Sequence, residues 1–163
     1  MKITDLQTYE KPKYIGEGRD GIVYRISDDK AAKTPHPPGV FKRVFKTIGH
    51  ESLIAQRLYD DIFPVPKPYG LHMVNFDFAT QEAFVMEYIQ GQVLAELNHT
   101  KVGRDAYQLF IDIIKKIKQK GYTPLDAYPE NVIVKENGLI VLIDFADWKH
   151  PEILYPQSLD RVI

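Results

Sequence analysis

Cysteine is absent from the 163-residue sequence, and this absence removes several classes of chemistry at once. Without a thiol the chain can form no disulfide, no thiolate metal site and no cysteine nucleophile. The five histidines are scattered without the spacing of metal ligands, so we do not expect a histidine metal centre. Stability is expected to come from packing alone.

Long apolar runs and a strong net charge are also missing. Nowhere do roughly 18 apolar residues occur together, and no apolar stretch follows the basic start at Lys2. We therefore expect no membrane span and a soluble, cytoplasmic protein, with export as an effector left open. The formal charge is −1, from 21 basic and 22 acidic residues, so no overall field favours a nucleic-acid partner. Any phosphate binding must come from local groups.

Two proline-rich segments, residues 35–39 and 63–68, divide the chain into three stretches. Proline cannot donate a hydrogen bond within a helix or a central strand, so both segments are predicted connectors. Before the first connector, short β-rich runs at 13–15, 21–26 and 30–33 predict a three-strand meander.

Helical and extended patterns alternate in the rest of the chain. Between the connectors, the apolar spacing over residues 50–59 predicts one amphipathic helix. Later segments predict strands at 69–73 and 82–89, a long helix at 104–120, and a hairpin of 132–134 with 139–143.

The first motif with chemical content is a glycine-rich run placed between two predicted strands, Gly16-Glu17-Gly18-Arg19-Asp20-Gly21-Ile22-Val23. In a dinucleotide-binding fold such a run opens a helix, whereas between two strands it can form a hairpin turn that covers phosphates with main-chain N–H groups. A plain glycine-rich turn is the alternative interpretation.

Lys33 ends the third predicted strand, and Glu51 follows 18 positions later in the predicted helix. A strand-borne ammonium held by a glutamate is a positioned cation that can reach the phosphates of a nucleotide. An exposed strand lysine is the simpler alternative.

Taken in order, these motifs resemble those of the protein-kinase superfamily, over residues 14–148. The segment from Phe84 to Gly91 resembles the strand and hinge that hold adenine in kinases. The loop Leu125-Asp126-Ala127-Tyr128-Pro129-Glu130-Asn131 is similar to the kinase catalytic loop, and Asp144-Phe145-Ala146 resembles the DFG motif.

The resemblance implies an α+β, bilobal protein-kinase-like fold within a single domain, 1–163. It comprises an N-lobe (1–88) with a five-stranded antiparallel sheet and one main helix, a hinge (89–91), and a truncated, mostly helical C-lobe (92–163).

The resemblance also assigns the site residues. Asp126, Lys33 and Glu51 are the implied catalytic residues, with Asp126 accepting the proton of the attacking hydroxyl. Asn131 and Asp144 are the implied metal ligands, and the cofactors are ATP and Mg²⁺, with Mn²⁺ as an alternative ion. The implied nucleotide contacts are Gly16, Gly18, Gly21, Val23, Lys33, Met86 as gatekeeper, Glu87 and Ile89.

Several positions depart from the kinase pattern. Pro124-Leu125 stands where regulated kinases carry His-Arg, Tyr128 replaces a lysine that contacts the γ-phosphate, and Ala146 replaces the DFG glycine. The sequence continues for only 19 residues after Asp144, too few for an activation loop and the distal helices. In this respect the chain resembles minimal kinases such as the RIO type and short bacterial effector kinases.

Three functions remain open on the sequence alone. The first is a minimal Ser/Thr-type protein kinase with a protein substrate. The second is a small-molecule kinase similar to the aminoglycoside and choline kinases, and the third is a pseudokinase acting as a nucleotide-binding interaction module. The apolar segment from Trp148 to Tyr155 is expected to fold back over the 104–120 helix, or else to form a docking patch for a dimer mate or substrate protein.

Overall fold

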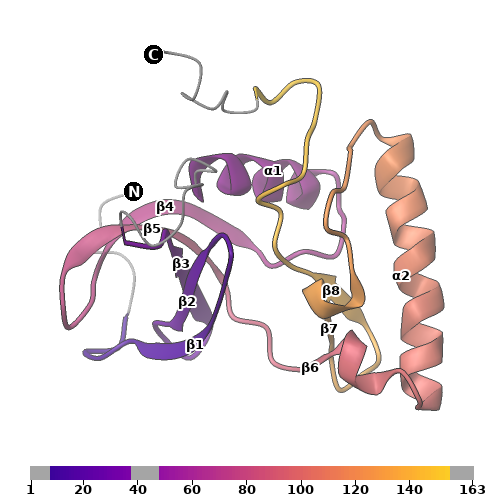
Figure 1. The fold of residues 1–163 in the computed structure, drawn as a ribbon, viewed down its shortest axis with the longest axis horizontal. Helices are drawn as coiled ribbons and strands as arrows, with labels where there is room; N and C mark the ends of the chain where they lie inside the picture. The colour runs from indigo at the N-terminus through magenta and orange to yellow at the C-terminus, as the bar shows by residue number, and fades with distance from the viewer. Residues whose placement is uncertain (1–7, 38–47, 155–163) are drawn as a thin grey trace.

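The computed structural model describes residues 8–37 and 48–154, which form a five-stranded antiparallel sheet, a smaller sheet and two α-helices (Figure 1). The larger sheet has the strand order β1-β2-β3-β5-β4. Its strands are β1 (Lys13–Gly18), β2 (Gly21–Arg25), β3 (Lys30–Thr34), β4 (Pro68–Asn75) and β5 (Thr80–Glu87). The predicted meander is confirmed, because β1, β2 and β3 are antiparallel neighbours in that order.

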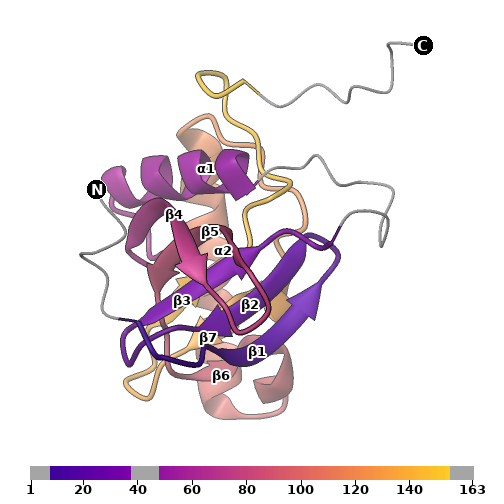
Figure 2. The ribbon, with the colours of Figure 1, turned by 90° about the vertical axis from the view of Figure 1, so that its left-hand side faces the viewer.

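Helix α1 (Ile48–Asp60) packs beside β4 and β5 (Figures 1 and 2). Its apolar stripe, Ile54, Ala55 and Leu58, is almost fully buried, as helical spacing of apolar residues requires. A separate apolar cluster in the same sheet includes Ile26 and Val85. The sheet therefore carries apolar contacts beyond those that hold α1.

A second structural unit follows β5, with a small sheet packed beside a long helix. The small sheet has the order β6-β7-β8, and β7 and β8 lie between the larger sheet and α2 in Figure 1. Its elements are β6 (Gln92–Val93), the 3₁₀ turn η2 (Leu94–Leu97), α2 (Lys101–Gln119), the 3₁₀ turn η3 (Pro129–Asn131), β7 (Val132–Val134) and β8 (Ile140–Leu142).

The boundaries of α2 and of the β7–β8 hairpin follow from local sequence. The Thr100 hydroxyl accepts a hydrogen bond from the Gly103 N–H, which caps the first turn of α2. Gly138 adopts a φ of +82° in the turn after Asn137, a backbone conformation that glycine reaches without strain. The predicted helix and hairpin are thus both present.

The mostly helical character expected for the second half is not confirmed. Within the described part of residues 92–163, α2 is the single α-helix, and the rest is short strands, 3₁₀ turns and irregular chain. None of the described helices is long and apolar enough to cross a membrane.

The segment after Asp144 packs against the body of the protein through Trp148. This indole is 2% exposed and lies edge-to-face with Phe145, with ring centroids 5.0 Å apart. The Trp148 carbonyl hydrogen-bonds a ring nitrogen of His50 on α1 at 2.7 Å, and Lys149 pairs with Thr123 just beyond α2. The segment thus contacts α1 and the chain that follows α2, and its folding over the 104–120 helix stays a prediction. Leu154 is 92% exposed, and Tyr155 lies outside the described residues.

Candidate functional site

Three charged side chains from distant parts of the chain meet below the turn between β1 and β2. The Nζ atom of Lys33, on β3, lies 2.8 Å from Oε2 of Glu51 on α1 and 3.3 Å from Oδ1 of Asp144. Lys33 and Glu51 are both buried, and the Asp144 side chain is 38% exposed. The sequence-predicted pair therefore forms, and Asp144 joins it at the open side.

Glu51 also connects α1 to the segment that follows β8. Its Oε1 atom accepts a hydrogen bond of 3.1 Å from the main-chain N–H of Phe145. Because Phe145 is next to Asp144, this bond helps fix where the Asp144 carboxylate lies.

Electrostatics favour a protonated Lys33. Burial by itself would lower the pKa of the Lys33 ammonium, but the carboxylates of Glu51 and Asp144 more than offset it and hold the pKa above its ordinary value. Burial raises the pKa of the Glu51 carboxyl, an effect that the Lys33 ammonium opposes. The 2.8 Å contact favours the ionised pair, with a cation presented toward Asp144.

Two of the predicted acids occupy left-handed backbone conformations that are uncommon for residues other than glycine. Asp126 has a φ of 56° and Asp144 a φ of 65°. Among the described non-glycine residues, Ile62 is the only other one with a positive φ. Such conformations gather at functional sites, where the surrounding structure holds the backbone in place.

Asn131 is held next to Asp126 by the loop that joins them. Its side-chain Nδ2 donates to the main-chain carbonyl of Asp126 at 2.9 Å. The main-chain carbonyl of Asn131 accepts a hydrogen bond from the N–H of Ile143 at 2.9 Å. Because the side-chain nitrogen of Asn131 is used in the bond to Asp126, the side-chain oxygen is the atom suited to bind a cation.

A cavity of about 580 Å³ lies between the glycine turn and the Lys33 cluster. This volume is in the usual range for small-molecule sites. Of the predicted site residues, only Asp126 is not part of the lining. The others that line it are Gly16, Gly18, Gly21, Val23, Lys33, Glu51, Met86, Glu87, Ile89, Asn131 and Asp144.

The cavity walls fit a nucleotide. Ala31, Val23 and Ile143 provide apolar surface, and a Cβ added at Gly16 or Gly18 would meet nothing within 4 Å, so that turn has open space beside its backbone. Next to the wall, the N–H groups of Glu87 and Tyr88 are bonded to carbonyls of Lys67 and Asp29. Among the described residues the Ile89 N–H has no acceptor, so it is available to a ligand.

A divalent cation could be held by Asp144 and Asn131 together with phosphate oxygens. Among residues 8–37 and 48–154, no group of three or more His, Cys, Asp or Glu side chains could hold a metal by itself. One carboxylate and one amide oxygen suit Mg²⁺, which usually keeps waters and substrate phosphates in its coordination shell.

Sequence reasoning missed two residues at this site, Arg19 and Asp147. The Arg19 guanidinium, in the turn between β1 and β2, lies 3.0 Å from Asp126 and also contacts Asp147. Asp147 is nearly buried, with 8% of its side chain exposed. The only sequence signals were that Arg19 lies inside the glycine motif and that Asp147 follows Asp144 by three positions.

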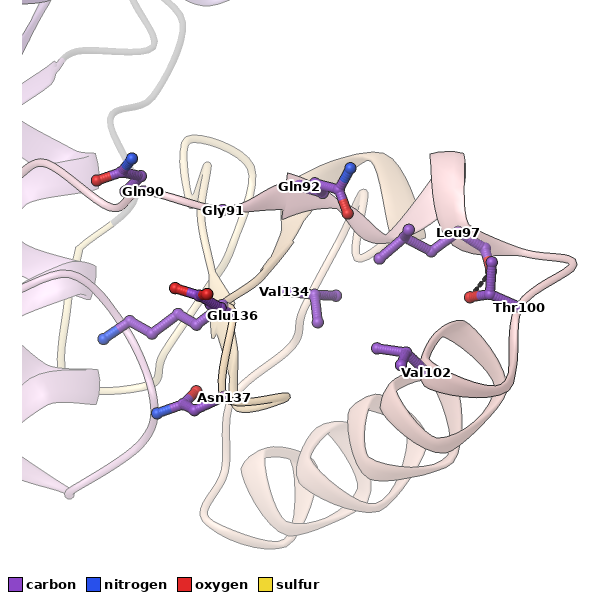
Figure 3. A pocket seen from close by; sticks show the side chains of 10 residues that line it. Gln90, Gly91, Gln92, Leu97, Thr100, Val102, Val134, Glu136 and Asn137 are labelled. Atoms are coloured by element: carbon purple, nitrogen blue, oxygen red, sulfur yellow. Dashed lines mark hydrogen bonds between the residues drawn. The ribbon is translucent and has the colours of Figure 1, made fainter.

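A larger and more open cavity, of about 1060 Å³, lies beside the small sheet (Figure 3). Figure 3 shows Gln90 and Gln92 along one edge, Leu97 and Val102 near the start of α2, and Asn137 on the hairpin. Its two charged residues, Lys135 and Glu136, form no convergent cluster of the kind around Lys33. We therefore place the candidate functional site at the smaller cavity, because the polar side chains converge there.

Comparison with known proteins supports the fold. No family model matches this sequence. Among solved structures, the co-crystal structure of WbdD with a kinase inhibitor matches with a TM-score of 0.57 and 16% sequence identity. The match covers 83% of this chain and 33% of the WbdD chain, so this chain spans about a third of that protein's length. At this identity the similarity shows the fold alone: the chain has a kinase-like fold.

Proposed function

We propose that this chain is an ATP- and magnesium-dependent phosphotransferase, in the form of a minimal Ser/Thr-type protein kinase. The observation that carries this proposal is the meeting of Lys33, Glu51 and Asp144 below the glycine turn, in a cavity that Asn131 also lines. In this proposal residues 1–88 form the N-lobe, 89–91 the hinge and 92–163 a small second lobe.

Each polar residue of the proposed site has a defined task in the proposed reaction. Lys33, held by Glu51, neutralises the α- and β-phosphates of ATP. Asp144 and Asn131 hold Mg²⁺, which supplies charge neutralisation at the phosphates when it is bound. Asp126 orients the acceptor hydroxyl and takes its proton.

The position of Asp126 favours a protein acceptor. Its side chain is 44% exposed and lies outside the cavity lining, so an acceptor can reach it from the surface. The neighbouring Leu125 and Tyr128 side chains are 43% and 58% exposed. Exposed, partly apolar surroundings of this kind suit a peptide segment better than a small polar molecule that needs enclosure.

A transfer assay tests the proposal. The wild type, Asp126→Asn and, as a matched control, Asp77→Asn in the exposed β4–β5 turn are incubated with labelled Mg-ATP and a cell lysate, and phosphorylated proteins are identified by mass spectrometry. We expect transfer to Ser or Thr by the wild type and the control, and a loss of about 100-fold or more with Asp126→Asn.

The other outcomes decide between the alternatives. Nucleotide binding with phosphate appearing only on small molecules would replace the protein acceptor by a metabolite. Nucleotide binding without any transfer would favour the pseudokinase, and equal transfer by wild type and Asp126→Asn would remove Asp126 from the mechanism.

A further inference from the structure

The guanidinium of Arg19 connects the tip of the glycine turn to two other parts of the site. Its Nη2 atom lies 3.5 Å from Asp20 in the same turn and 3.0 Å from Asp126, and it contacts Asp147 beyond Asp144. Arg19 and Asp126 are 107 positions apart in the sequence, so this contact is a product of the fold.

Several acids share the Arg19 guanidinium. One cation faces three carboxylates, and one of them, Asp147, is nearly buried. A single exposed ion pair contributes little to stability. The Arg19 side chain is 45% exposed and the Asp126 side chain is 44% exposed, so this pair can exchange for another partner at little cost.

The proposed phosphotransfer needs a positive charge near the acceptor, and the loop of residues 124–131 carries no lysine or arginine. Negative charge must be neutralised at the transferring phosphoryl group, and a cationic side chain is the usual means. Tyr128 stands where the resemblance leads one to expect a lysine, and its main-chain N–H donates to the Asp126 carbonyl at 3.1 Å. Tyr128 thus brings no cationic side chain to this loop, while Arg19 reaches Asp126 from the glycine turn.

We propose that Arg19 is the cationic group that contacts the γ-phosphoryl group and takes over the role of the missing lysine. The inference rests on the proposed function. Without nucleotide, Arg19 is held by Asp126 and Asp147. With ATP, the guanidinium turns to the γ-phosphate, and Asp126 is released to receive the acceptor hydroxyl.

The reaction is balanced without a covalent role for Arg19. The acceptor oxygen forms a bond to the γ-phosphorus as the bond from that phosphorus to the bridging oxygen of ADP breaks. The hydroxyl proton goes to Asp126, and the bridging electron pair leaves with ADP. Arg19 contributes charge and two parallel N–H donors, which a guanidinium can offer to one phosphate.

Nucleotide affinity distinguishes this role from a structural one. Binding of Mg-ADP and of a non-hydrolysable Mg-ATP analogue is measured by calorimetry for wild type, Arg19→Ala, Arg19→Lys and the control Arg104→Ala, an exposed arginine on α2. Because ADP lacks the γ-phosphate, we expect Arg19→Ala to weaken the affinity for the ATP analogue by about 10- to 100-fold. The affinity of this variant for ADP should stay within about twofold of the wild-type value. Arg19→Lys should restore part of the difference, and Arg104→Ala should change neither affinity.

Thermal unfolding without nucleotide controls for damage to the fold, and Arg19→Lys retains the charge if Arg19→Ala proves unstable. The proposal is overturned if Arg19→Ala weakens the affinities for ADP and for the ATP analogue equally, or if the variant prefers the analogue over ADP as strongly as the wild type does. A wild type that binds neither nucleotide overturns the proposed function itself, and this inference with it, so the two failures are distinguishable.

Discussion

Glu51 holds Lys33 with one carboxylate oxygen at 2.8 Å and the main-chain N–H of Phe145 with the other at 3.1 Å. One side chain on α1 thereby positions both a strand of the larger sheet and the segment that carries Asp144. The shape of the candidate site depends on this carboxylate, because it fixes two of the site's walls at once.

Removing Lys33 should destabilise the protein through the charge that it leaves behind. We expect Lys33→Met to lower the free energy of unfolding by about 3–5 kcal/mol, since Glu51 would remain as an uncompensated buried acid. The double variant Lys33→Met/Glu51→Gln should be more stable than the single one, because Gln still offers an acceptor to Phe145. Urea denaturation measures both, and a double variant less stable than the single one would contradict the expectation.

The Lys33 contribution should also persist to alkaline pH. Its folded-state pKa lies above the ordinary value of 10.5, so its stabilisation is fully present below about 10.5 and disappears as the pH rises through the higher folded-state pKa. We expect the difference in unfolding free energy between wild type and Lys33→Met/Glu51→Gln to stay constant from about pH 7 to 10. A difference that declines steadily across this range would show that the ammonium loses its proton earlier.

Gly21 should tolerate no side chain, in contrast to Gly16. A Cβ at Gly21 would lie 2.3 Å from the Thr34 carbonyl oxygen, whereas one at Gly16 would meet nothing within 4 Å. We expect Gly21→Ala to cost about 1–3 kcal/mol of stability and Gly16→Ala to cost less than about 1 kcal/mol. Thermal unfolding of both variants tests this, and equal losses would argue against the close approach of β2 to β3.

Trp148 should anchor the segment after Asp144. Its indole is 2% exposed within the main apolar cluster, whereas Leu154 is 92% exposed. We expect Trp148→Ala to lower the unfolding free energy by about 3–5 kcal/mol and Leu154→Ala to stay within about 0.5 kcal/mol of wild type. If the tryptophan variant unfolds like wild type in urea, the segment does not pack as described.

Much of the fold was predictable because its signals are local. The β-rich runs before residue 35 and the helical spacing after residue 48 each specify an element from neighbouring residues, and the structure has both elements. The Lys33–Glu51 pair was predictable because it needs only a strand, a helix and their packing. Asp144, which joins this pair in the structure, was predicted only as a metal ligand. The contact between Asp144 and Lys33 depends on how the larger sheet and the second structural unit meet.

Long-range side-chain contacts were the part that sequence reasoning could not reach. Arg19 meets Asp126 and Asp147 only after the glycine turn folds over the site, and no periodicity or spacing encodes that approach. The expectation of a mostly helical second half came from the superfamily as a whole. That expectation gave too little weight to the hairpin that the same sequence predicted, whose strands β7 and β8 flank Asn137 and Gly138 in the described residues.

The central claim is that Asp144 helps bind a magnesium nucleotide at the cavity beside Lys33. Calorimetric titration of the wild type, Asp144→Asn and Asp77→Asn with Mg-ATP, repeated without Mg²⁺, tests it most directly. We predict magnesium-dependent binding by wild type and Asp77→Asn, and an affinity about tenfold or more weaker for Asp144→Asn. Equal affinities for all three proteins, or binding that ignores the metal, would contradict the account.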